Sequence, residues 1–340
     1  MKPNTGRPLR KYRILRTMLI NSALIKAYAR MGQKGAAAGI GMMELAKNDP
    51  DMRVVVADSV AIASLDRFYN NYPERVINVG ISEQSMIGIA SGLSSEDGRT
   101  VYACTYAAFV LVKAIEFVRH NLAYHQFNVK LVGNSAGFAM ETLSISHWAT
   151  EDIAMARALP NMTILSAADS LEAIKMVIAA HDILGPVYIR LSGLLNCPIV
   201  HEKDFDFKIG KAITLRKGDD VTIVATGMMV KESLDAASIL ADKGINCEVI
   251  DMHTIKPLDT DCLDIAFEKS KLIVSVEEHS VIGGLGGAIA EYKADKYNAP
   301  RLVIIGVDDF YCKLGELRYC WEQYGLTAPQ IAVRIEKELI

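Results

Sequence analysis

Short apolar runs alternate with segments of helical period over most of the chain, and this alternation limits the fold more than any other feature. Strands buried on both faces read as continuous apolar runs, which are typical of parallel sheets covered by helices on both sides. In the first half the predicted strands are residues 52–57, 76–79, 100–105, 129–133, 162–166 and 187–191. The predicted helices there include residues 36–47, 106–124, 150–159 and 170–181. The sequence therefore predicts an α/β fold with a mostly parallel sheet.

The alternation stops at residues 193–210, where a polar run and a Cys-Pro pair replace it, and then begins again. This break is interpreted as a linker between two domains. The predicted strands beyond it are residues 221–225, 247–252, 272–276 and 302–307, with helices that begin near Met229, Thr260, Leu285 and Leu314. The predicted organisation is an arm at 1–34, a domain at 35–192, the linker, and a domain at 211–340.

The first 34 residues differ from the rest in charge, because nine Lys and Arg residues occur there and no acidic residue precedes Glu44. A targeting peptide has this composition. The apolar stretch is interrupted by Asn21 and Lys26, which disfavours a secretory signal. The interpretation favoured here is an arm that packs on a partner subunit or stays partly mobile.

Composition excludes several classes of protein. The net charge of −3 gives no reason to expect a nucleic-acid partner. The six cysteines contain no C-x-x-C pair, which disfavours a zinc site or a secreted disulfide scaffold and predicts reduced thiols in the cytoplasm. No apolar run approaches the roughly 20 residues that span a membrane.

Residues 75–93 join a short β-branched strand to an apolar helix, with Gly80 at the turn and Ser82 as a predicted N-cap. Glu83 therefore lies at the start of a core helix. A buried carboxylate needs a partner, since desolvation penalises its charge. One interpretation is that Glu83 only caps its own helix. The other is that it faces a ligand.

The segment Val79-Gly80-Ile81-Ser82-Glu83-Gln84 resembles the "VGIAEQ" motif in the pyrimidine-binding domain of transketolases. From about residue 35 onward the chain resembles the C-terminal half of that thiamine-diphosphate family. The resemblance implies two consecutive three-layer α/β/α domains: a pyrimidine-binding domain, then a transketolase C-terminal domain. It also implies that Glu83 bonds N1′ of the aminopyrimidine ring and favours the imino tautomer, whose nitrogen removes the thiazolium C2 proton.

Three more residues match family segments that lie near the cofactor. Asp58 stands in a segment that resembles "ADL", and Tyr106 and Phe109 stand in one that resembles "TFxxF". The resemblance implies that Phe109 stacks on the aminopyrimidine, as a flat apolar ring can. The alternatives are a helix cap for Asp58 and core packing at helical spacing for the two aromatic residues.

His147 is placed by the segments that follow it, which resemble the family from Glu151 through Met162. It matches the histidine of "GEDGPSHQ", a substrate-contacting residue of the family. An imidazole can bond sugar hydroxyls and carry protons, which makes His147 a predicted catalytic and substrate-binding residue. The alternative is a structural histidine.

The substrate pocket departs from the family pattern. Residues 141–144 replace "GEDG", so that Leu143 stands where an aspartate contacts a donor hydroxyl. Ser135 replaces a second histidine, and the two phosphate-binding arginines fall at Gly35 and Gly193. Glycine cannot replace the bidentate bonds of arginine. Ser135 and Arg190 remain as candidate substrate contacts.

The chain lacks the Gly-Asp-Gly motif with which the family holds Mg²⁺ and the diphosphate. The resemblance therefore implies that thiamine diphosphate is shared with an N-terminal, diphosphate-binding partner chain, which holds Mg²⁺, in an α2β2 heterotetramer. The predicted activity is transfer of a two-carbon ketol unit from a ketose to an aldehyde, with an atypical pocket. The alternatives are a β-type subunit of a 2-oxo-acid dehydrogenase and a non-catalytic regulatory or scaffold subunit.

Overall fold

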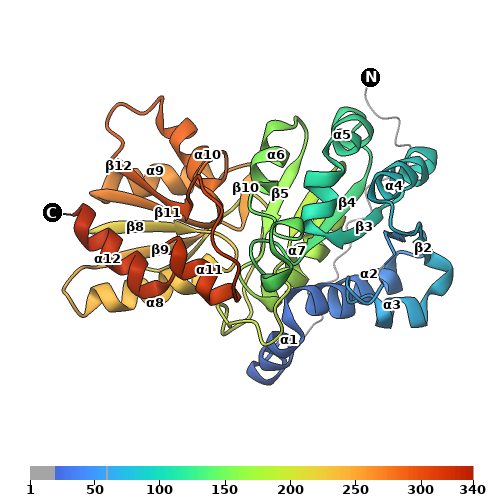
Figure 1. Cartoon of the computed structure of the whole chain (residues 1–340), viewed down its shortest axis with the longest axis horizontal. Helices are drawn as coiled ribbons and strands as arrows, with labels where there is room; N and C mark the ends of the chain where they lie inside the picture. Colours follow the sequence, from blue (N-terminus) through green and yellow to red (C-terminus); the bar gives the residue numbers. More distant parts are fainter. Residues whose placement is uncertain (1–19, 59, 340) are drawn as a thin grey trace.

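Two sheets, each covered by helices on both faces, form the protein (Figure 1). The computed structural model describes residues 20–58 and 60–339. The first nineteen residues of the predicted arm therefore lie outside the described residues. Both sheets are mostly parallel, so the α/β architecture predicted from the alternation is confirmed. In the described part of the chain, no helix combines the length and apolar character needed to cross a membrane.

The first sheet has the strand order β10-β5-β6-β4-β3-β1-β2. Its strands are β1 (Arg53–Val56), β2 (Val76–Asn78), β3 (Val101–Tyr106), β4 (Val129–Asn134), β5 (Thr163–Ser166), β6 (Val187–Arg190) and β10 (Thr254–Lys256). All neighbours are parallel except β10, which runs antiparallel to β5. Strand β10 comes from the second half of the chain and was not predicted. The two domains are therefore joined through one sheet.

Helices cover both faces of this sheet. One face packs against α1 (Ser22–Ala36), a π-helical turn η2 (Ala37–Met42), α2 (Met43–Asn48) and α7 (Ser170–His181). The other packs against α4 (Glu83–Asp97), η4 (Ala108–Lys113), α5 (Ile115–Phe117), η5 (Val118–Tyr124) and α6 (Asp152–Ala158). The short helices α3 (Asp66–Asn71), η3 (Pro73–Arg75) and η6 (Glu141–Ser146) lie in connections. The single helix predicted at 106–124 is instead two π-helical turns around one α-helical turn.

The predicted arm needs correction over residues 20–34, which belong to the first domain. Ile25, Tyr28 and Ala29 are buried in its core, beside α7. Gln33 fixes the helix by two buried bonds: its Nε2 donates to the Ala167 carbonyl at 2.8 Å, and its Oε1 accepts from the Ser192 amide at 2.6 Å. Among the described residues of the arm, Lys26 and Arg30 lie on the exposed face of this packed helix.

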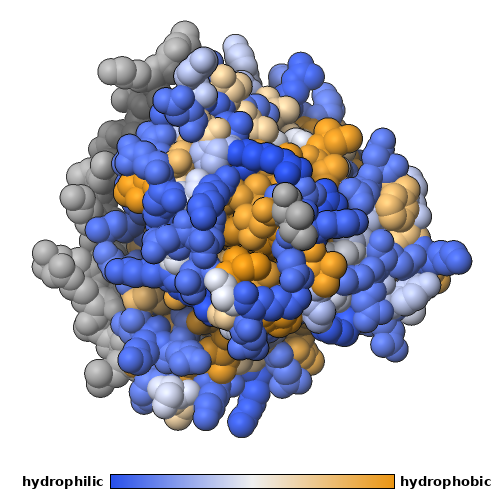
Figure 2. Space-filling model, turned by 90° about the vertical axis from the view of Figure 1, so that its left-hand side faces the viewer, coloured by the Kyte–Doolittle hydropathy of each residue, from blue (hydrophilic) through white to orange (hydrophobic). Residues whose placement is uncertain are grey.

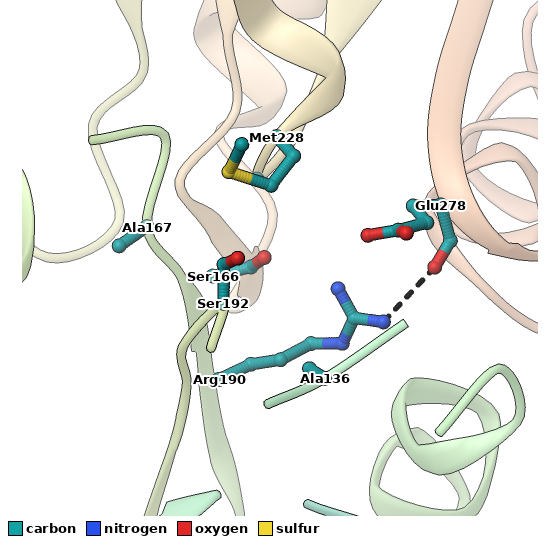
Figure 3. Close-up of a pocket in the computed structure, with 8 residues that line it drawn as sticks. Ala136, Ser166, Ala167, Arg190, Ser192, Met228 and Glu278 are labelled. Atoms are coloured by element: carbon teal, nitrogen blue, oxygen red, sulfur yellow. Dashed lines mark hydrogen bonds between the residues drawn. The ribbon is translucent and has the colours of Figure 1, made fainter. Parts of the chain in front are cut away.

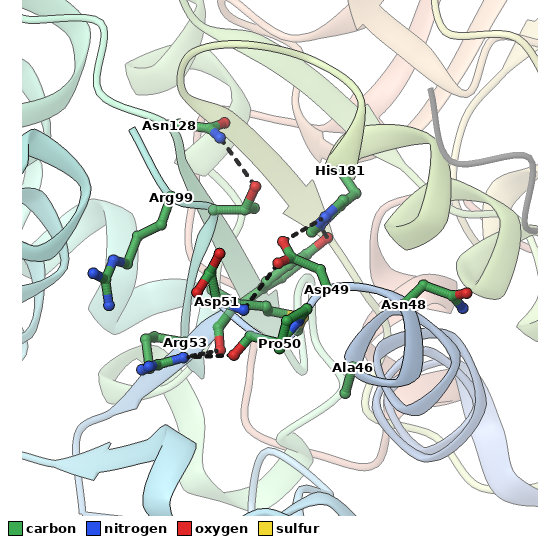
Figure 4. A network of polar contacts seen from close by, with 12 residues as sticks. Ala46, Asn48, Asp49, Pro50, Asp51, Arg53, Arg99, Asn128 and His181 are labelled. Carbon is green, nitrogen blue, oxygen red and sulfur yellow. Dashed lines mark hydrogen bonds and ion pairs between the residues drawn. The ribbon is translucent and has the colours of Figure 1, made fainter. Parts of the chain in front are cut away.

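A polar network joins the turn before β1 to the C-terminal end of α7 (Figure 4). Asp49 Oδ2 lies 3.2 Å from Nε2 of His181, and Oδ1 accepts from the Asp51 amide at 3.0 Å. Nη1 of Arg53 donates to the Pro50 and Met52 carbonyls. These bonds fix the entry into β1, whose far end contributes to the candidate site.

The second sheet has the strand order β12-β11-β8-β9-β7. Its strands are β7 (Ile213–Arg216), β8 (Val221–Ala225), β9 (Cys247–Asp251), β11 (Leu272–Ser280) and β12 (Arg301–Val307). Its helices are α8 (Met229–Ala241), α11 (Leu317–Gln323) and α12 (Ala328–Glu338) on one face, and α9 (Thr260–Lys269) and α10 (Leu285–Lys293) on the other. Viewed from this end, the surface is mainly hydrophilic, with hydrophobic residues near its centre (Figure 2).

A buried ion pair of the first domain, between Arg190 and Asp152, carries a guanidinium that also bonds to the second domain. Arg190 Nε donates to Asp152 Oδ2 at 2.9 Å, and the Tyr188 hydroxyl donates to the same oxygen at 2.5 Å. Nη2 of Arg190 donates to the carbonyl of Ala149 at 3.0 Å and to that of Glu278, on β11, at 2.9 Å. The guanidinium thus joins α6, β6 and the second sheet.

We expect Asp152→Ala to lower the free energy of unfolding by about 3–5 kcal/mol, because Arg190 would then be a buried charge without its counter-ion. Denaturant unfolding of the purified chain measures this. Glu291→Ala is the matched control: Glu291, which pairs with Arg157 at 2.5 Å, is 70% exposed, so its removal should cost only about 0–1 kcal/mol. Equal losses in the two variants would contradict the assignment.

Candidate active site

The carboxyl ends of parallel strands share one edge of the first sheet, where ligands of such folds bind. Val56 of β1 pairs with Asn78 of β2 and with Cys104 of β3. Tyr106, at the end of β3, pairs with Asn134 at the end of β4. The residues that follow these strands, which include most of the predicted site, therefore emerge side by side.

Glu83 is the first residue of α4, and its side chain is 2% exposed. The turn before it depends on Gly80, whose φ of +73° favours glycine, and on Asn78, whose Oδ1 accepts from the Gly80 amide at 3.0 Å. The carboxylate forms a short ion pair with the ammonium of Lys113, which is 43% exposed. Among the described residues, the Lys113 ammonium is the ion-pair partner of the Glu83 carboxylate.

Three rings gather beside this ion pair. The Phe109 ring centroid lies 5.4 Å from that of Tyr106 and 5.1 Å from that of His147, and Tyr106 and His147 are also 5.4 Å apart. Nζ of Lys113 lies 5.5 Å from the centre of the Phe109 ring. Glu83, Tyr106, Phe109, Lys113 and His147 form one connected group, the Glu83 cluster.

The local backbone explains why Phe109 and Lys113 share a face. Both belong to the π-helical turn η4, and residues four apart on a helix lie on the same face. Phe109 remains partly exposed. It packs on four small residues: Ala107, Ala108, Ala136 and Ala149. An antiparallel bridge between Gly137 and Ala149 returns the chain over β4 and brings His147 to the rings.

Asp58 lies next to the cluster without joining it. It is exposed, with a φ of +70°, and its backbone forms two 3.0 Å bonds with the Asn78 side chain. Asn78 thus connects the end of β1 to the Gly80 turn. The structure does not make Asp58 a cap of a following helix, and whether it touches the cofactor stays a prediction.

Ser135 and Arg190 have contacts different from those expected of substrate-binding residues. Arg190 is used in the ion pair with Asp152 and in the bond to the Glu278 carbonyl, and its Nη1 faces a small cavity between the domains (Figure 3). Ser166, Ser192 and Glu278 also line this cavity, whose volume of about 10 Å³ fits one water molecule rather than a sugar. Ser135 is buried against Gly193.

Burial dominates the electrostatics of this interdomain region. It raises the pKa of Glu277 to about 7, although the carboxylate accepts the Leu285 and Gly286 amides at the start of α10. It also lowers the pKa of His279 to about 4. His279 Nε2 accepts from the Ala154 amide, and Nδ1 contacts the Ser280 carbonyl, which fits a neutral ring. These groups support the domain contact and lie outside the Glu83 cluster.

The departures from the family pattern have clear structural settings. Leu143 is 48% exposed in the segment that leads to His147, so the side chain at this position is apolar and accessible. A Cβ at Gly193 would clash with Ser135 Oγ and lie 2.9 Å from its Cβ. An arginine at position 193 is therefore incompatible with Ser135 as placed.

Sequence reasoning missed Lys113 and Asn78. Lys113 is four residues after Phe109 on a predicted helix, and i, i+4 spacing is the signal that could have found it. Asn78 ends a predicted strand two residues before Gly80, a position where an Asx side chain often bonds the backbone of a turn.

Two family models match the chain. The transketolase pyrimidine-binding domain matches residues 34–196, and the transketolase C-terminal domain matches residues 210–331. A "putative transketolase C-terminal section" from Methanocaldococcus jannaschii is 37% identical over 311 residues, which cover 90% of this chain and 96% of that one. The chain belongs to the transketolase family.

Two further similarities refine this membership. A 6-deoxy-6-sulfo-D-fructose transketolase subunit from a Clostridium species is 40% identical over 292 residues, covering 85% of this chain and 89% of that subunit. A solved structure described as a split-gene transketolase, an inactive beta4 tetramer, has a TM-score of 0.80 and 39% identity. The match covers 90% of this chain and 98% of that one. The transketolase-type domains predicted from the sequence are confirmed.

We expect Gly193→Ala to destabilise the transketolase chain by about 1–3 kcal/mol, the usual cost of overpacking. In a Ser135→Gly background most of this cost should disappear, because the clashing side chain is gone. A double-mutant cycle on unfolding free energies measures the coupling. Gly88→Ala is the control: its Cβ meets nothing within 4 Å, so it should not destabilise. Additive effects of the two substitutions would disprove the contact.

Proposed function

We propose that this chain is the C-terminal subunit of a two-chain, thiamine-diphosphate-dependent transketolase that transfers a two-carbon ketol unit from a ketose to an aldehyde. The observation that carries the proposal is the Glu83 cluster. A carboxylate 2% exposed lies beside a half-exposed aromatic ring, and its counter-ion is a partly exposed lysine on a flexible stem. This arrangement suits a flat heteroaromatic ring with a basic nitrogen.

The residues present fit the aminopyrimidine end of the cofactor. Phe109 offers one ring face for stacking, and Glu83 offers a dry carboxylate beside it. When bound, thiamine diphosphate supplies a nucleophilic carbon and an electron sink for cleavage next to a ketone. We propose that the Mg²⁺ and the diphosphate are held by the partner chain, since this chain carries no Gly-Asp-Gly.

Each residue of the cluster has a distinct proposed task. Glu83 holds a proton at Oε through a charge-assisted bond, which burial strengthens. Lys113 neutralises that carboxylate in the free chain and must release it before a ring nitrogen can bind there. His147, beside Phe109, donates to or accepts from a substrate hydroxyl. Asp58 is kept as a contact at the cofactor edge.

The proposed partner is an N-terminal, diphosphate-binding chain in an α2β2 tetramer. Support comes from the exposed apolar residues next to the cluster and elsewhere on the surface, such as Ile81 and Ile145. The similar split-gene transketolase is described as inactive when its β chains form a tetramer by themselves. We further propose a cytoplasmic location, where the six cysteines, all free, stay reduced.

The alternatives receive less support. The relatives described above are transketolase chains, which favours this activity over that of a 2-oxo-acid dehydrogenase subunit. A non-catalytic scaffold would not need a buried carboxylate beside an aromatic ring, because the desolvation of the carboxylate costs stability. The altered pocket is better explained by an unusual substrate.

We expect Glu83→Gln to reduce kcat of the reconstituted two-chain enzyme by about 10²–10⁴-fold, since the amide keeps the shape but cannot take a proton. Steady-state assays with the partner chain measure this, and the single chain should be inactive. Glu116→Gln, at an exposed position on α5, is the control and should keep full activity. Near-normal turnover of the Glu83 variant would reduce Glu83 to a helix residue.

We also expect weak activity with xylulose 5-phosphate and ribose 5-phosphate. Leu143 cannot bond a donor hydroxyl, and glycines stand where phosphate-binding arginines are expected. Two lost charge-assisted bonds cost about 3–6 kcal/mol, or about 10²–10⁴-fold in kcat/KM. A ketose with an unphosphorylated or otherwise modified terminus should be preferred.

Leu143→Asp tests the position directly. It should raise kcat/KM for ordinary donors roughly tenfold or more by restoring one hydrogen bond. Ile145→Asp, an equally exposed apolar residue nearby, is the control and should bring no gain. Transketolase-like efficiency of the unmodified enzyme on the standard sugar phosphates would contradict the proposal.

A further inference from the structure

A second group of titratable side chains is buried far from the Glu83 cluster in the sequence. It consists of Glu172 in the first turn of α7, His201 in the linker, Asp251 at the end of β9, and His253 just beyond it. All four side chains are buried, and the group is called the linker cluster here. It lies where both domains and the linker meet.

The ligating atoms of three members converge. Nε2 of His201 lies 3.7 Å from Oε1 of Glu172 and 3.5 Å from Oδ2 of Asp251, and one atom from each residue falls within 4.8 Å of the others. Ligands about 2.0–2.1 Å from a tetrahedral zinc ion are roughly 3.3–3.5 Å apart. The spacing is thus close to that of a coordination shell and slightly too long for good hydrogen bonds.

The same atoms lack hydrogen-bond partners within the described residues. These atoms are Oε1 of Glu172, Nε2 of His201, both carboxylate oxygens of Asp251, and Nε2 of His253. Buried polar groups are normally satisfied, and each exception costs stability. Four of these five atoms belong to the three residues whose ligating atoms converge, which points to a common partner for them.

The neighbouring bonds hold these side chains as an outer shell holds ligands. Glu172 turns its other oxygen, Oε2, to the Ala168 amide at 2.6 Å, which leaves Oε1 to face the cluster. The His201 ring stacks on Phe205, with centroids 3.8 Å apart, and the His201 amide donates to Asp169. Hydrogen bonds to a ligating side chain orient it toward a metal, and the Ala168 bond does this for Glu172.

We propose that the linker cluster binds one divalent metal ion of the zinc type through Glu172, His201 and Asp251, with a water in the fourth position that bonds to His253. An imidazole among the ligands disfavours Mg²⁺ and Ca²⁺, which prefer all-oxygen shells. A doubly charged ion also balances the two buried carboxylates. This ion is distinct from the Mg²⁺ proposed for the partner chain.

Such an ion would tie three separate segments together. Glu172 belongs to the first domain, Asp251 to the second, and His201 to the linker. Because the cluster is buried, the ion enters while the chain folds and its binding stabilises the folded state. The inference concerns stability and domain docking, and it does not depend on the proposed activity.

The experiment uses the full-length chain, refolded with Zn²⁺ or Co²⁺ and passed over a desalting column. We expect about one metal ion per chain by elemental analysis, and a visible absorption band with Co²⁺. Refolding with EDTA should lower the unfolding midpoint, and Zn²⁺ but not Mg²⁺ should restore it.

His201→Gln should abolish retention of the metal, whereas His125→Gln, which changes an exposed histidine, should leave it unchanged. If His201→Gln does not fold, Asp251→Asn and the Co²⁺ spectrum of the unmodified chain decide the matter. No retained metal in the unmodified chain, or equal retention in both histidine variants, would overturn the proposal. In that case His201 is a protonated imidazole between two carboxylates.

Discussion

The buried Arg190 guanidinium is the constraint on which the rest of the structure depends. A buried cation is tolerated only if hydrogen-bond acceptors replace the water around it. Here the acceptors are one Asp152 oxygen and two backbone carbonyls. These acceptors come from α6, from the segment after His147, and from β11. Satisfying one charge therefore fixes the distance between the two sheets and the path of the chain past the candidate site.

Much of the fold could be predicted because its strands are buried on both faces. The buried run Val54, Val55 and Val56 predicts β1, and the helix after Ser82 follows from its apolar spacing. Strands β7 and β10 could not be found in the same way. Each is only three or four residues long at a sheet edge, and β10 depends on a partner strand about ninety residues earlier in the chain.

The same difference between local sequence pattern and long-range contact applies to the candidate site. Glu83, Tyr106 and Phe109 lie on segments whose local pattern carries the information, and the structure brings them together with His147. The pairing of Lys113 with Glu83 and the linker cluster depend on contacts between distant segments, which no local pattern encodes. Arg190 is a candidate substrate contact through the family resemblance alone, whereas in three dimensions its charge is compensated inside the protein by Asp152.

Strand β10 has a consequence for how the polypeptide can be assembled. Until residues 254–256 leave the ribosome, β5 is an open sheet edge with unpaired amides and carbonyls. The two regions that family models separate at residues 196–210 therefore share one sheet. A chain shortened to its pyrimidine-binding region would leave the outer edge of β5 unpaired and open to other strands, whereas the intact chain pairs that edge with β10.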